Sequence, residues 1–303
     1  MKYANRSRIF VGISLAIMLV AVVMSLTGHG INYGIDFAGG LNMQYNVNST
    51  FLQEDVETAL AEVGVTDYKI ATSGEDGHIL QLSIAKLSDE NEIQVLQEKL
   101  EELLLVNYPN LDTTNVQTGY VGPVAGATLV RNAILSVLLA SLLMLVYIAV
   151  RFDFSSGLAA VIGLLHDVCI MLSFMVIFRN IIQMNSSFIA AMLTIVGYSI
   201  NNTIVIFDRI RENHNKPSFH SLSGNEIVNL SVRQSLGRTI VTTLTTLATM
   251  VTLYIVGVDS IREFSLPIIV GIIAGSYSAN LINGYVWAFI NERVAKGKKK
   301  RTA

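Results

Sequence analysis

Residues 158–178 read LAAVIGLLHDVCIMLSFMVIF. A helix crosses the roughly 30 Å hydrocarbon core of a membrane with about 20 predominantly apolar residues, and this stretch has that length and character. It also carries a carboxylate, Asp167, near its middle. The stretch therefore predicts a membrane-spanning helix with an ionisable group inside the bilayer.

Five further apolar runs of comparable length occur, at 9–26, 133–150, 188–207, 240–258 and 264–290. The whole chain agrees with them: it is 51% hydrophobic and 15% charged, whereas globular chains carry about a quarter charged residues. The first run could be a cleaved signal peptide, but such a peptide has an apolar region of only about 7–15 residues. We favour an uncleaved anchor, and hence a polytopic α-helical protein with six transmembrane helices.

The distribution of basic residues predicts the orientation of these helices. If the N-terminus is cytoplasmic, fifteen of the 21 lysines and arginines fall at the inner ends or in inner segments. These inner segments include residues 208–238 and a basic tail, 293–303. Basic residues are enriched on the cytoplasmic side of membrane proteins. We therefore expect a multi-pass protein of the cell (inner or plasma) membrane with both termini in the cytoplasm.

Residues 29–127 form a distinct acidic block. It lies between residues 1–28, which hold the N-terminus and the first helix, and residues 128–292, which hold helices two to six. The block holds fifteen of the 23 acidic residues but only three basic ones. Alternating and helical patterns follow one another as strand 41–47, helix 51–63, strands 67–72 and 78–84, helix 90–107 and strand 115–121. This β-α-β-β-α-β order predicts an extracytoplasmic α+β domain of the ferredoxin-like type. Its carboxylates are either a solvated surface or a docking face for a partner or an unfolded chain.

Enzymatic chemistry is not indicated. The single cysteine, Cys169, excludes an intramolecular disulfide and a CxxC metal or redox site. We find no nucleophile–base pair, phosphate-binding loop or metal-ligand cluster. We therefore expect no catalytic residues, no resident metal or cofactor, and no nucleic-acid partner.

Asp167 is the strongest candidate for function. A charged side chain in the middle of a membrane costs about 2.5–3.5 kcal/mol on insertion scales, and such residues mark ion pathways by default. Supporting groups for an ion relay are the adjacent His166, the asparagines of the fourth run and the threonines of the fifth: Asn201, Asn202, Thr245 and Thr249. The alternatives are hydrogen bonding between helices for the asparagines and close helix packing for the threonines.

Three motifs resemble those of one family. Residues 34–40 read GIDFAGG directly after the first apolar run, residues 166–168 read HDV, and residues 196–213 read VGYSINNTIVIFDRIREN. At these places in a six-helix topology they resemble the SecF family of the RND-like superfamily. Members of that family work with SecD beside the SecYEG protein-export channel.

The resemblance implies a role in using the proton gradient, or in some members a sodium gradient, to promote late steps of polypeptide translocation. It implies SecD, SecYEG, the translocating unfolded polypeptide and membrane lipid as partners. Asp167 matches the family's intramembrane relay aspartate. Structural or conformational roles fall to Gly34, Asp36, Gly39, Gly40, Asp208 and Arg209. Members of the family often carry Asp at the position of Asn202. The middle of the fourth run, 188–207, therefore has no carboxylate in this chain.

Two other functions remain open from the residues alone. A non-transporting scaffold of the translocon would need the helices but not the ionisation of Asp167. A small-molecule exporter of the same superfamily would need a larger outer region, and no aromatic-rich pocket is evident in the sequence. In either case the glycines of GIDFAGG permit tight turns where the chain leaves the membrane.

Overall fold

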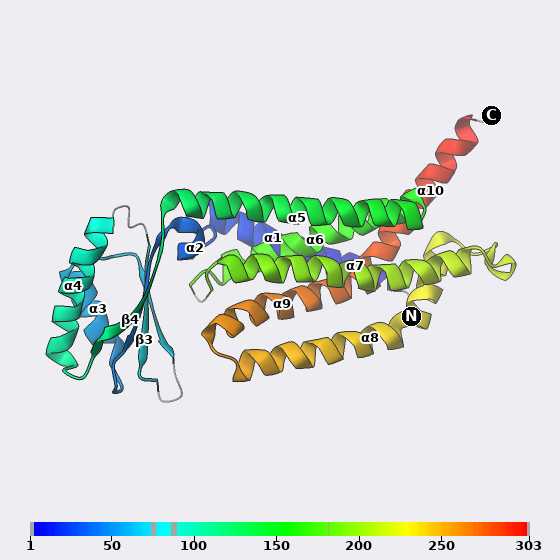
Figure 1. Ribbon diagram of the computed structural model, residues 1–303. Helices are drawn as coiled ribbons and strands as arrows, with labels where there is room; N and C mark the ends of the chain where they lie inside the picture. Colours follow the sequence, from blue (N-terminus) through cyan, green and yellow to red (C-terminus); the bar gives the residue numbers. More distant parts are fainter. Residues whose placement is uncertain (1–2, 74–76, 86–89, 181, 302–303) are drawn as a thin grey trace. The chain divides into compact units, whose positions relative to one another are not determined.

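A computed structural model of the chain describes residues 3–73, 77–85, 90–180 and 182–301 (Figure 1). The chain forms two compact units. The helical unit comprises Met1–Asn32, Leu135–Ile182 and Ser187–Ala303, and the sheet unit comprises Tyr33–Ile134 and Gln183–Ser186. The sequence also predicts a hairpin turn at 74–77 and a helix cap at Ser88. Residues 74–76 and Ser88 lie outside the described residues.

Six helical stretches of the described chain are long and apolar enough to span a membrane, in agreement with the prediction. They are α1 (Tyr3–Leu26), α5 (Pro123–Arg151), α6 (Phe154–Ile177), α7 (Ser186–His214), α8 (Gly224–Val256) and the stretch formed by α9 (Asp259–Ser278) and α10 (Gly284–Arg301). Between α9 and α10 lies a π-helical segment, Ala279–Asn283. Such segments widen a helix locally and are frequent at functional sites.

The segment 208–238 consists mostly of the ends of two long helices. Helix α7 continues to His214, a 3₁₀ turn follows at Pro217–Phe219, and α8 begins at Gly224. A capping box starts α8, because Ser223 and Glu226 satisfy each other's backbone N–H groups. The Asn213 side chain donates to Ser231 and Gln234 and so ties the end of α7 to the start of α8.

The sheet unit has the predicted β-α-β-β-α-β order. Its strands are β1 (Gly40–Asn46), β2 (Tyr68–Ser73), β3 (Ile79–Ala85) and β4 (Asp112–Val121), and its helices are α3 (Gln53–Glu62) and α4 (Glu90–Asn107). The strands form one antiparallel sheet in the order β2-β3-β1-β4. Alternate residues of the central strands are buried against the two helices, with Met43, Leu82 and Leu100 fully enclosed. A short helix, α2 (Ile35–Ala38), precedes β1 and was not predicted.

The backbone at the start of β1 requires glycine. Gly39 and Gly40 have φ angles of 76° and 152°, which side chains rarely allow. A Cβ on Gly40 would also overlap the Ile84 carbonyl oxygen and lie 3.1 Å from the Ala85 Cα on the neighbouring strand. We expect Gly40→Ala to destabilise the sheet unit by more than about 1 kcal/mol, because strain and overlap act together.

Limited proteolysis of the full chain within residues 41–121, followed against temperature, measures this effect. Gly119→Ala in β4 is the matched control, because a Cβ there has open space around it and no positive φ. Equal protection of the two variants would contradict the assignment.

Tyr45 makes the sheet unit sensitive to alkali. Its ring is fully buried and its hydroxyl donates to Glu101 Oε1 at 3.2 Å. Burial, and next the nearby Glu101 carboxylate, raise the pKa of Tyr45 above its ordinary value. The folded-state pKa thus exceeds the unfolded one of about 10, so stability is complete below pH ~10 and falls as pH rises beyond it.

We therefore expect the sheet unit to lose stability above pH ~10, with a smaller loss in Tyr45→Phe, which has no phenol to ionise. Thermal unfolding of both proteins across this pH range measures the difference. Identical alkaline profiles would show that Tyr45 does not carry the effect.

Candidate functional site: a buried carboxylate in the helical unit

Asp167 lies on α6 with none of its surface exposed. Its Oδ2 accepts hydrogen bonds from two serine hydroxyls on other helices, Ser199 of α7 in a short bond and Ser278 of α9 at 2.9 Å. Its Oδ1 lies 2.8 Å from Nδ1 of His166. Three helices therefore supply donors to one carboxylate, which is the arrangement that a buried charge requires.

His166 extends this cluster to a fourth helix. Its Nε2 lies 2.8 Å from Ser14 Oγ on α1 and 3.3 Å from the Tyr277 hydroxyl, and Ser14 and Tyr277 lie 2.9 Å apart. Both imidazole nitrogens of His166 therefore have hydrogen-bonding partners. The cluster is thus a continuous hydrogen-bonded chain from α1 to α7 and α9.

Small residues let the helices approach this carboxylate. A Cβ on Gly275 would lie 3.2 Å from Ser199 Cβ and 3.5 Å from Asp167 Oδ2. Ser199 and Ser278 are themselves small and almost fully buried. Helices in membranes associate through such small residues, which allow short hydrogen bonds across the interface.

Further polar groups lie one or more helical turns along the chain from Ser199 and Ser278, on α7 and in the π-helical segment. Asn283 Nδ2 donates to Thr203 Oγ1 at 2.9 Å, and the Asn283 amide occupies the space that a side chain at Gly163 would fill. Asn283 Oδ1 and Asn202 Nδ2 are buried without a hydrogen-bond partner in the described part of the chain. A buried amide group without a partner is costly, so these atoms indicate a place where water can enter.

The site differs from the sequence-based expectation in its supporting residues. His166 contacts Asp167 as expected, and Asn202 is buried one helical turn away from Ser199. Asn201 is exposed, and the hydroxyls of Thr245 and Thr249 donate to backbone carbonyls of their own helix, on exposed positions of α8. The structure therefore does not bring Asn201, Thr245 or Thr249 to Asp167.

Sequence reasoning missed the groups that do reach Asp167 and His166, namely Ser14, Ser199, Tyr277 and Ser278. The sequence feature that could have identified the two serines is their position on their helices. Ser199 lies at the level of the α7 centre, and Ser278 lies three residues after Gly275, on the same face of α9.

The GIDFAGG residues belong to the sheet unit. Asp36 Oδ2 accepts a hydrogen bond of 2.8 Å from the Ser186 backbone N–H, and the Gly34 N–H donates to the Met184 carbonyl at 2.8 Å. The motif thereby holds residues 183–186, which continue directly into α7. Gly39 and Gly40 have the positive φ angles that a turn requires, whereas Gly34 has an ordinary extended φ of −69°.

Asp208 and Arg209 lie near the C-terminal end of α7 and are half-buried. Asp208 pairs with Arg211 at 3.3 Å, and Arg209 bonds to Gln234 at 2.8 Å and to Glu212. The Gln234 contact links α7 to α8. In the part of the chain that the structure describes, neither residue is hydrogen-bonded to the Asp167 cluster, and their structural or conformational role stays a prediction.

The cluster brings together the two kinds of side chain, carboxyl and imidazole, that most often give and take protons in proteins. Among the described residues, no group of three or more His, Cys, Asp or Glu side chains could hold a metal ion.

The fold and the buried carboxylate define a class: polytopic membrane proteins with an intramembrane acidic residue and a ferredoxin-like domain between the first two spans. Residues 102–293 match the family described as protein export membrane protein SecD/SecF, C-terminal, and residues 25–50 match the SecD/SecF GG motif. The chain belongs to the SecD/SecF family of protein export membrane proteins.

Individual relatives match over most or all of the chain. The protein translocase subunit SecF of Rhodothermus marinus is 34% identical over 100% of this chain and 96% of its own. SecF of Rickettsia bellii is 36% identical over 88% of this chain and 86% of its own. The crystal structure of SecDF, a translocon-associated membrane protein from Thermus thermophilus, matches with a TM-score of 0.79 and 32% identity.

The SecDF proteins are longer than this chain. The match to the Thermus structure covers 96% of this chain and 39% of the SecDF chain. The match to SecDF of Bacillus subtilis, at 33% identity, covers 94% of this chain and 37% of that protein. In these relatives the part similar to this chain is joined to a further part in one polypeptide. The relatives are named as components of protein transport.

Ser278 provides a direct test of the cluster. We expect Ser278→Ala to destabilise the helical unit by about 1.5–3 kcal/mol, because it removes a hydrogen bond to a charged group. Thr249→Ala is the matched control, since the Thr249 hydroxyl donates to a backbone carbonyl of its own helix. Thermal unfolding of the two variants measures the difference, and an equal loss of stability in both would contradict the site.

Proposed function

We propose that this chain acts with SecD as an ion-driven membrane subunit of the protein-export machinery. In this role it promotes late steps in the passage of an unfolded polypeptide through the SecYEG channel. The observation that carries the proposal is the fully buried Asp167, hydrogen-bonded by serines of two other helices and by His166. Membership of the SecD/SecF family supports the choice of substrate and partners.

The coupling ion that we propose is the proton. Asp167 is paired with an imidazole, and a proton that binds either group is shared through the hydrogen bond between them. Each charge that crosses a potential of 100 mV supplies about 2.3 kcal/mol, which is enough to shift a conformational equilibrium nearly fiftyfold.

The orientation is part of the proposal. We place the N-terminus, the end of α7 and the basic tail in the cytoplasm and the sheet unit outside it, in the cell membrane. The distribution of basic residues supports this orientation, because fifteen of 21 then lie at or beyond the inner helix ends. The fifteen acidic residues of the block 29–127 then face the side on which the exported chain emerges.

Reconstitution with SecD and SecYEG in proteoliposomes tests the function. We expect Asp167→Asn to abolish the stimulation of export by an imposed proton gradient while leaving gradient-independent export intact, because the amide cannot bind and release a proton. Asp112→Asn is the control: Asp112 is a half-buried carboxylate at the start of β4, in the sheet unit, and it accepts hydrogen bonds from Thr114 and Asn115.

The outcomes separate the alternatives. Undiminished stimulation in Asp167→Asn would refute the relay and leave a scaffold of the translocon as the function. Stimulation by a sodium gradient in the absence of a proton gradient, lost in the same variant, would keep the relay and replace the ion.

A further inference from the structure

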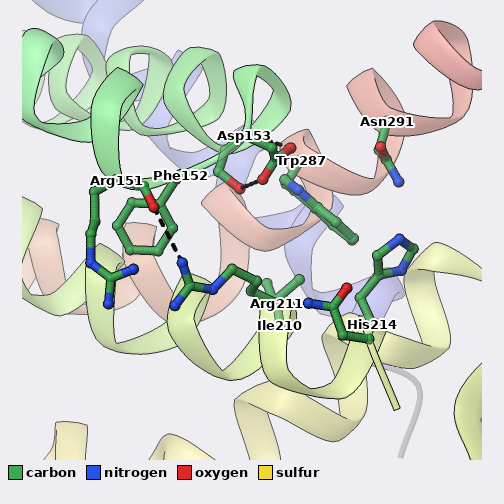
Figure 2. Close-up of a pocket in the computed structure, with 10 residues that line it drawn as sticks. Arg151, Phe152, Asp153, Ile210, Arg211, His214, Trp287 and Asn291 are labelled. Carbon is green, nitrogen blue, oxygen red and sulfur yellow. Dashed lines mark hydrogen bonds between the residues drawn. The ribbon is translucent and has the colours of Figure 1, made fainter. Parts of the chain in front are cut away.

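A pocket of about 360 Å³ lies at one end of the helical unit, where the α5–α6 link, the end of α7 and the start of α10 meet. Figure 2 shows Phe152 and the Arg211 side chain on one side of it and the rings of Trp287 and His214 on the other. Arg151 and Asn291 also line it. This is the end that we place in the cytoplasm, and the volume lies within the range of small-ligand sites.

Two arginines, a histidine and a tryptophan bring hydrogen-bond donors to the pocket, and the carboxylate of Asp153 also lines it. Arg151 and Arg211 carry fixed positive charges, and their guanidinium groups lie 5.6 Å and 5.4 Å from the centre of the Phe152 ring. His214 packs edge-on against Trp287, with ring centres 5.8 Å apart. Arginine is suited to phosphate because its planar donors match the geometry of the oxygens.

Trp287 contributes an unpaired hydrogen-bond donor to the wall of the pocket. The residue has a relative exposure of 3%, and its Nε1 has no hydrogen-bond partner among the described residues. The indole N–H is a donor only, so an acceptor is needed to satisfy it.

The carboxylates of Asp153 and Asp208 do not accept a hydrogen bond from Trp287 Nε1. Both carboxylate oxygens of Asp153 are bonded to Ser156, through the hydroxyl at 2.6 Å and the backbone N–H at 3.4 Å, as the N-cap of α6. Asp208 pairs with one nitrogen of Arg211. A second nitrogen of Arg211 donates to the backbone carbonyl of Arg151. This bond orients the Arg211 guanidinium and leaves the charge of the Arg151 side chain unchanged.

The surroundings identify the source of the anion as a lipid. Val150 and Phe154, which flank the pocket residues in sequence, are 85% and 74% exposed. Large apolar side chains with this exposure at the end of a membrane span lie against acyl chains. Basic pockets between helix ends on the cytoplasmic side bind the headgroups of anionic lipids.

We propose that the pocket formed by Arg151, Arg211, His214 and Trp287 binds the phosphate of an anionic phospholipid headgroup. The phosphate oxygens accept from the arginines and from Trp287 Nε1, and the acyl chains extend past Val150 and Phe154. The site is separate from the Asp167 cluster, and it stands whether or not the chain transports an ion.

Lipid binding by the purified full chain tests the site. The protein is placed in phosphatidylcholine nanodiscs doped with phosphatidylglycerol, and retained phosphatidylglycerol is measured by native mass spectrometry. We expect the double variant Arg151→Gln, Arg211→Gln to retain it at least about fivefold less, since each arginine near the surface contributes about that factor. We expect Trp287→Phe, which keeps an aromatic ring but loses the N–H, to show a loss in the same direction.

Arg293→Gln is the matched control, because the Arg293 guanidinium packs on Phe289 at 4.1 Å and does not line the pocket. If the double variant fails to fold, Trp287→Phe alone decides. Equal retention by wild type, the pocket variants and Arg293→Gln would overturn the proposal. Displacement of the lipid by excess inorganic phosphate would assign the pocket to free phosphate and overturn the lipid as its occupant.

Discussion

The helical unit is organised around one electrostatic constraint, the need to satisfy a carboxylate that water does not reach. Asp167 has no exposed surface, and an isolated charge in such a place would be prohibitively costly. Ser199 and Ser278 meet this need from two other helices, and His166 meets it from the same helix. The close approach of α7 and α9 to α6, allowed by Gly275, is therefore tied to the charge of a single side chain.

This arrangement links ionisation to helix packing. Serine hydroxyls donate to the ionised carboxylate, whereas a protonated carboxyl is itself a donor and leaves fewer acceptor sites. A proton on Asp167 therefore changes which of its partners can remain bonded. Because those partners lie on different helices, we propose that a proton on Asp167 favours one helix packing over another, which is the physical requirement for driving a conformational change.

The sequence predicted the spans, the sheet topology and the contact of His166 with Asp167, but not the hydroxyl groups around these two residues. Length and apolar content define a membrane span, alternation defines strands such as β1, and a lone mid-membrane acid is conspicuous. Packing sets how each helix is rotated about its own axis. Sequence periodicity does not reveal that rotation when the helix is apolar on all sides. Thr245 and Thr249 therefore looked as suitable as Ser199, although their hydroxyls bond to their own helix and those of Ser199 and Ser278 reach Asp167. The pocket at Trp287 was likewise beyond prediction, because its residues come from three separate segments of the chain.

The central claim, that Asp167 gains and loses a proton within its cluster of donors, is tested most directly by infrared spectroscopy of the protein in lipid. The carboxylic C=O stretch of a protonated aspartic acid is resolved from the bands of ionised carboxylates. Difference spectra between wild type and Asp167→Asn, recorded across pH, isolate the contribution of this one group. The account predicts a C=O band that appears on acidification and is missing in the variant. A spectrum in which Asp167 keeps one ionisation state at every pH would contradict it.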